Sequence, residues 1–130
     1  GKQDWHEDPH AIWYHRTTGI WQTVWLESVP TQHVTAINWK SDLTTGTVTV
    51  EVGLSRRADS VVQVRIAHEG RVLGTASVTA SDMSTTLTFP LAGQTNGQHY
   101  EHLLWRPENP VLLDAWVQVE TAGSETDAVA

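Results

Sequence analysis

The stretch Thr47-Val-Thr-Val-Glu-Val-Gly-Leu54 has the most regular alternation in the chain, and it decides the class of fold. Apolar residues occupy every second position from Val48 to Leu54, and mostly polar residues lie between them. Successive side chains of a β-strand point to opposite faces, so this pattern predicts a strand with one buried face and one face in solvent. The turn residues Thr44-Thr45-Gly46 come directly before it and favour a tight reversal of the chain.

Similar stretches lie before and after residues 47–54, and turn residues such as His68-Glu69-Gly70 separate them. The further predicted strands are residues 34–39, 62–67, 71–80, 84–91 and 113–120, and residues 92–99 have the composition of a loop. No segment shows a ten-residue helical period. Short strands at close spacing predict an antiparallel β-sandwich. We expect its inward side chains to include Val50, Val52, Val62, Val64, Ile66, Leu87, Phe89, Leu113, Ala115, Val117 and Val119.

The predicted sandwich has about seven strands, and the pattern of residues 20–29 predicts an extra N-terminal strand segment. β-Branched and aromatic residues dominate it, with Gly19 before it and Pro30 after it. Its apolar side chains fall on both faces, so such a strand needs a cover on each side. We expect an ordered segment of this kind to pack on the edge of the sandwich or on a second copy of the chain, forming a homodimer.

Composition limits the classes of function. The chain has 130 residues, 39% of them hydrophobic, with seven Trp, which argues against intrinsic disorder. No apolar run reaches the roughly 20 residues of a membrane span, so we expect no membrane partner. The net charge of −7 with only eight Lys and Arg argues against a nucleic-acid partner. The chain has no cysteine, which excludes disulfides and zinc–thiolate sites, and no pattern indicates a cofactor.

The segment Tyr14-His-Arg-Thr-Thr-Gly-Ile-Trp-Gln-Thr-Val-Trp-Leu-Glu27 resembles a motif of the family 2 glycoside hydrolases, the β-galactosidases, β-glucuronidases and β-mannosidases. In that family it ends a sugar-binding jelly roll and leads into an immunoglobulin-like second domain. The matching positions are Tyr14, Arg16, Thr17, Gly19 to Gln22 and Val24 to Glu27. A second stretch, Leu104-Trp-Arg-Pro-Glu-Asn-Pro110, is similar to the family's Leu-Trp-Ser-Pro-Glu-Asn-Pro motif, with Arg106 in place of Ser.

Both ends of the chain also resemble the family, so the resemblance covers nearly the whole chain. Gly1-Lys2-Gln3 is similar to an element upstream of the first motif, and residues 126–130 are similar to the lead-in to the catalytic barrel. The resemblance implies three parts. Residues 1–30 are the end of the sugar-binding domain, residues 31–120 form an immunoglobulin-like sandwich, and residues 121–130 lead into a barrel.

Retaining glycosidases use two carboxyl groups about 5 to 5.5 Å apart. In this family the resemblance places both on the barrel, the acid in an Asn-Glu dipeptide, and no such dipeptide occurs here. We therefore expect no catalytic residue in this chain. Glu108 lies between two prolines, and we interpret its carboxylate as a partner for backbone donors where this loop meets another domain.

Two groups of histidines suggest a metal site, but their spacing does not favour one. Residues 4–15 contain His6, His10 and His15 among three carboxylates, with Pro9 inside the group, and a second pair is His99 and His102. Structural zinc sites fix ligand spacing on a turn or a helix, which these groups do not resemble. We expect no metal ligand here.

The tryptophans indicate either contacts between domains or stacking of sugar rings. Indoles bury large areas at interfaces. Trp116 lies on the outward-facing side of its predicted strand, and Trp21 and Trp25 share one face of theirs. We interpret the chain as a domain that positions a sugar-binding domain against a catalytic barrel. The alternatives are a free carbohydrate-binding module and a fibronectin-type scaffold. The predicted contact residues are Arg16, Trp21, Trp25, Trp105, Arg106, Glu108, Asn109 and Trp116.

Overall fold

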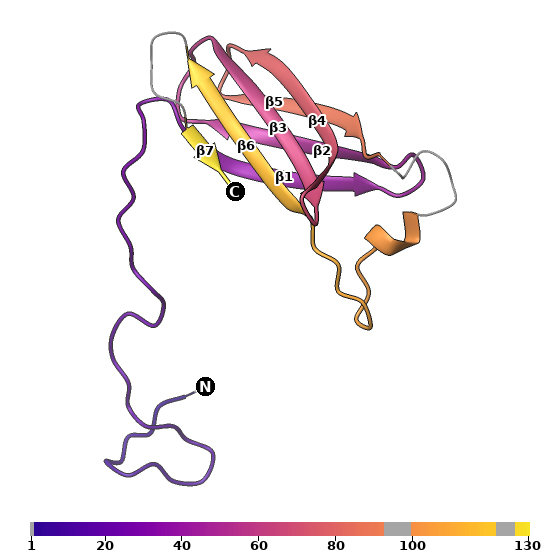
Figure 1. Ribbon diagram of the computed structural model, residues 1–130. Coiled ribbons are helices and arrows are strands. Elements are labelled where there is room, and N and C mark those ends of the chain that lie inside the picture. The colour runs from indigo at the N-terminus through magenta and orange to yellow at the C-terminus, as the bar shows by residue number, and fades with distance from the viewer. Residues whose placement is uncertain (1, 93–99, 122–126) are drawn as a thin grey trace.

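The computed structural model describes residues 2–92, 100–121 and 127–130 (Figure 1). Most of the predicted loop 92–99, with His99, and the beginning of the predicted lead-in lie outside the described residues. Within the described part of the chain there are seven strands and one short 3₁₀ helix. They are β1 (Val34–Asp42), β2 (Thr47–Leu54), β3 (Ser60–His68), β4 (Arg71–Ala80), β5 (Ser84–Pro90), η1 (Tyr100–Leu103), β6 (Asp114–Thr121) and β7 (Asp127–Val129).

The strands form two facing antiparallel sheets, which confirms the predicted immunoglobulin-like sandwich (Figure 1). One sheet has the order β1-β2-β5, and the other has the order β4-β3-β6-β7. Strand β4 pairs with β3, whereas in antibody constant domains the fourth strand joins the first sheet. The central strands β2, β3 and β6 are those with the cleanest alternation in the sequence.

The core lies between the two sheets and is made by the predicted inward positions. Val50, Val52 and Val62 are completely shielded from solvent, because each lies on a central strand and faces the opposite sheet. Full burial of such a side chain stabilises the fold by roughly 1.5–3 kcal/mol. The other buried apolar residues of this cluster are Val48, Leu54, Val64, Ile66, Leu73, Ala80, Leu87, Phe89, Leu91, Leu103, Val117 and Val119.

The turns follow from local chemistry. Glu69 and Gly70 connect β3 to β4 with φ angles of 48° and 78°, as a two-residue type I′ turn requires. Between β1 and β2, Asp42 Oδ1 accepts hydrogen bonds from the amides of Thr44 and Thr45 at 2.8 and 3.3 Å. The bond from the Thr44 amide is the largest of the effects that lower the pKa of the Asp42 carboxyl.

The two open sides of the sandwich are closed differently. At β4 and β5 the sheets come so close that a Cβ on Gly74 would lie 3.0 Å from the Phe89 ring. At the other side, the Val34 amide donates to Asp127 Oδ2 at 2.8 Å, so β7 links the two sheets. The boundary predicted at residue 120 leaves out this strand, because three residues are too few to show an alternation.

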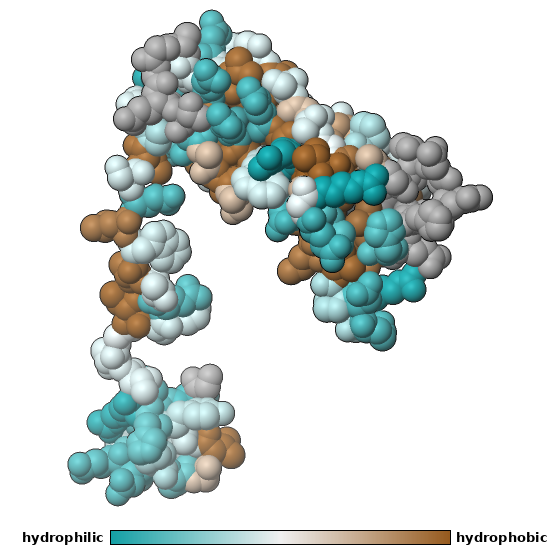
Figure 2. Space-filling model, viewed as in Figure 1, coloured by the Kyte–Doolittle hydropathy of each residue, from teal (hydrophilic) through white to brown (hydrophobic). Residues whose placement is uncertain are grey.

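The predicted N-terminal strand is not formed, which corrects the sequence-based expectation. Residues 20–29 belong to no strand and extend away from the sandwich (Figure 1). Apolar side chains along this segment lie in the open (Figure 2), and Leu26 is fully exposed. The residues have β propensity, but a strand also needs a neighbour for its backbone hydrogen bonds. We call residues 18–29 the N-terminal arm.

Candidate interdomain surfaces

The arm joins the sandwich at a buried polar network around Gln32. Gln32 is 2% exposed, and its Nε2 donates to the carbonyl of Arg56 at 3.2 Å and to Ser60 Oγ at 3.3 Å. Ser55 Oγ donates to Gln32 Oε1 at 3.4 Å and accepts from the His33 amide at 3.1 Å. These bonds fix the direction in which the chain enters β1. This network could not be predicted from the sequence, because a single Gln in a turn region carries no signal of burial.

Trp21 and Trp25 form the first candidate contact surface, on the arm. They are 86% and 72% exposed, which agrees with a segment that lacks the covers its sequence requires. The neighbouring Ile20 and Val24 are exposed as well, so the arm presents apolar groups in several directions. This exposed apolar surface makes the arm a candidate contact site.

Residues 2–17 form a closed loop beyond the arm, and Asp4 holds it together. The buried Asp4 carboxylate accepts hydrogen bonds from the amides of His6 and His10 at 2.9 and 2.7 Å, and its Oδ2 lies 2.7 Å from His10 Nδ1. The two ends of the loop meet where the Asp4 amide donates to the Tyr14 carbonyl at 2.9 Å. Burial raises the pKa of the Asp4 carboxyl, but the hydrogen bonds outweigh it and lower the pKa to about 2.

Arg16, another predicted contact residue, stabilises this loop. Its Nε donates to the Asp4 carbonyl at 3.0 Å, and its terminal nitrogen donates to the Trp5 carbonyl. The rings of Trp5 and Trp13 pack edge to face, with their centroids 5.3 Å apart. Arg16 would therefore affect a contact through the shape of the loop.

The second candidate surface is the segment 104–110, whose tip is a tight turn. The amides and carbonyls of Arg106 and Asn109 bond reciprocally at 3.1 and 3.0 Å, with Pro107 and Glu108 at the tip. The Glu108 carboxylate accepts no hydrogen bond from a described residue, so any partner for it must come from outside this part of the chain. Trp105 is 59% exposed and lines a hollow of about 230 Å³ with Leu43 and Leu113.

The two surfaces lie at opposite ends of the sandwich (Figure 1). Gln32, where the arm enters, bonds to Ser60, and Ser60 pairs with Thr121 at the end of β6. The segment 104–110 precedes Asp114, the first residue of β6. Strand β6 therefore spans the distance between them, and the fold does not bring the predicted contact residues together in one site.

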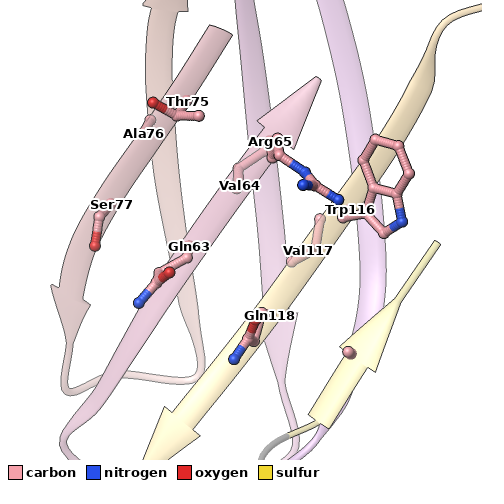
Figure 3. A pocket seen from close by; sticks show the side chains of 10 residues that line it. Gln63, Val64, Arg65, Thr75, Ala76, Ser77, Trp116, Val117 and Gln118 are labelled. Atoms are coloured by element: carbon pink, nitrogen blue, oxygen red, sulfur yellow. The ribbon is translucent and has the colours of Figure 1, made fainter. Parts of the chain in front are cut away.

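Trp116 lies on a third surface, the outer face of the β4-β3-β6-β7 sheet (Figure 3). It pairs with Arg65 across β3 and β6, and the Arg65 guanidinium carbon lies 4.1 Å from the centre of the indole. The pair lines a hollow of about 520 Å³. Alternation predicted that Trp116 faces outward, but its partner depends on the register of two strands far apart in the sequence.

The described residues contain histidines and carboxylates, which are common side-chain ligands of metal ions. No group of three or more His, Asp or Glu side chains within them converges as a metal site would require. The same part of the chain contains no helix with the length and apolar content to span a bilayer. The candidate surfaces carry exposed aromatic side chains, among them Trp21, Trp25 and Trp105.

The described residues form a two-sheet β-sandwich domain with exposed aromatic side chains. The sequence model of the glycosyl hydrolases family 2 matches residues 31–130, and the chain belongs to this family. The match includes all seven strands and the second motif. A comparison with curated proteins gives no match.

Proposed function

We propose that this chain is the non-catalytic immunoglobulin-like domain of a retaining β-glycosidase, in which it holds a sugar-binding domain in place against the catalytic barrel. One observation carries the proposal: a self-contained core separates two exposed aromatic surfaces at opposite ends. A rigid body with one contact surface at each end sets the distance between its two neighbours. Substrate positioning is sensitive, since an error of 1 Å can lower the rate roughly a hundredfold.

The family match supports membership in a group of glycosidases, and the sequence lacks the Asn-Glu dipeptide that the resemblance places on the barrel. In the proposed enzyme, residues 1–30 complete the sugar-binding domain, so that domain covers Trp21 and Trp25. The segment 104–110, with Trp105 and Glu108, contacts the next domain. The reaction of the parent is hydrolysis of a β-glycosidic bond with retention of configuration.

The experiment has two parts. The chain alone should not turn over chromogenic β-glycosides, and turnover abolished by changing one of its carboxylates would contradict the proposal. In an enzyme reconstructed from the coding sequence on both sides, Trp105→Ala should lower kcat/KM at least about tenfold with the sandwich still folded. Trp39→Ala, a change of a half-exposed Trp in β1 that does not line the hollow beside Trp105, is the matched control.

A free carbohydrate-binding module is the second candidate, favoured by the same exposed tryptophans. Titration with galactosides, glucuronides and mannosides, followed by the NMR shifts of the individual indole N–H groups, separates the two. A module should saturate below roughly 1 mM ligand through its exposed indoles. A spacer should leave the indole N–H shifts of Trp21, Trp25 and Trp105 unchanged.

A further inference from the structure

The polar side chains on the outer faces of the two sheets differ in their hydrogen bonding. On the β1-β2-β5 sheet, Thr49 and Thr88 bond to each other through their hydroxyls at 2.8 Å. On the β4-β3-β6-β7 sheet, the side chains of Gln63, Gln118 and Ser77 have no hydrogen-bond partner within the described part of the chain. This second face therefore keeps its donors and acceptors available.

The side chains on this face that line the hollow lie in two adjacent rows across the sheet (Figure 3). In one row Gln63 pairs with Ser77 on β4 and with Gln118 on β6. In the next row, two residues further along β3, Arg65 lies between Thr75 and Trp116. All of these residues line the hollow of about 520 Å³, a size that suits one or two sugar rings.

Arg65 supplies the charge of this hollow. No carboxylate of a described residue lies within ion-pair distance of it, although the chain carries 15 Asp and Glu. Its guanidinium is held over the Trp116 ring at 4.1 Å, which restricts the orientation of the planar fork. A fixed guanidinium presents paired N–H donors that match the two oxygens of a carboxylate.

We propose that this hollow binds an acidic sugar, a hexuronate, with its carboxylate on Arg65 and its hydroxyls on Gln63, Gln118 and Ser77. Amide and hydroxyl side chains donate and accept, which is what a ring with several hydroxyls requires. Trp116 acts by orienting the guanidinium, because Arg65 covers the ring face that a sugar would otherwise use. The site lies within this chain, so its test does not depend on the spacer function proposed above.

The test is a titration of the chain, labelled with ¹⁵N, with glucuronate up to roughly 50 mM at constant ionic strength. We expect saturable shifts of the Gln63 and Gln118 side-chain amides and of the Trp116 indole N–H. Arg65→Gln should weaken the affinity at least about tenfold, since a charge-assisted bond is lost. Arg71→Gln, which removes an arginine on β4 outside the hollow, should change it less than about twofold.

Three results would overturn the proposal. The first is the absence of saturable shifts at these side chains. The second is an equal response to glucose, which would mean that Arg65 does not recognise the carboxylate. The third is an equal response to acetate, which would make the hollow a site for an adventitious anion only.

Discussion

Strand β2 (Thr47–Leu54) and the arm segment 20–29 have similar β propensity, yet their surroundings in the structure are opposite. Val50 and Val52 of β2 are completely buried, whereas Trp21 and Leu26 of the arm are among the most exposed residues. Strand β2 has hydrogen-bonded neighbours on both sides, β1 and β5, and the arm has none within the described residues. High β propensity therefore favours a strand, but the strand forms only where a neighbouring backbone can pair with it.

The largest expected difference is between two leucines, one from each region. Leu54→Ala should destabilise the fold by about 2–5 kcal/mol, because a residue 2% exposed leaves a cavity in the core. Leu26→Ala should change the free energy of unfolding by less than about 0.5 kcal/mol. Urea denaturation followed by circular dichroism measures both. Equal effects would mean that the arm is part of the folded core.

Two glutamines, one buried and one on the arm, should show a smaller difference in their effects on stability. Gln32→Ala should lower the free energy of unfolding by about 1–3 kcal/mol. The variant leaves the buried hydroxyl of Ser60 and the Arg56 carbonyl without this donor. Gln22→Ala, on the exposed arm, is the control and should have no measurable effect. If the two variants unfold at the same urea concentration, the network does not anchor the entry of the chain.

The exposed arm should also make copies of the chain associate. We expect concentration-dependent dimers, with Trp21→Ser/Trp25→Ser weakening association about tenfold or more because two large apolar side chains are removed. Trp105→Ser, which removes an exposed indole at the other end, should leave the association unchanged. Sedimentation velocity measures all three proteins. A strictly monomeric solution of the unchanged chain at high concentration would contradict this expectation.

The smallest effect is local and depends on pH. The pKa of Asp4 is about 2 in the closed loop, below its ordinary value of 3.8, so the carboxylate stabilises the loop fully above about pH 4. This stabilisation should be lost as the pH falls through 2. NMR shifts of the Trp5 and Trp13 indole N–H groups report it. Asp4→Asn should abolish the transition, and Asp8→Asn, at an exposed carboxylate outside the network, should retain it.

Much of the fold could be predicted from the sequence, because alternation reports burial directly. The inward positions of β2, β3, β5 and β6 follow from period two alone. Strand β7 could not be predicted, since its pairing with β6 and its link to Val34 arise from tertiary structure. The arm was predicted wrongly as a strand, because its residues have β propensity but no neighbouring strand pairs with them.

The candidate surfaces were predictable only in part. Two apolar faces on one segment indicated a need for covers on both sides, and the structure leaves Trp21 and Trp25 exposed. The stacking of Arg65 on Trp116 depends on strand register, and the burial of Gln32 depends on how a turn packs. Neither relation is encoded in the local pattern around these residues.

Hydrogen exchange of backbone amides, measured residue by residue, tests most directly the claim that a stable sandwich carries an unpartnered arm. The amides of Val50, Val52 and Val64 should exchange through global unfolding and be the slowest in the chain. The amides of residues 20–29, at concentrations where the chain is monomeric, should exchange at nearly the rates of an unstructured peptide. Protection of the arm equal to that of β2 in the monomer would contradict the account.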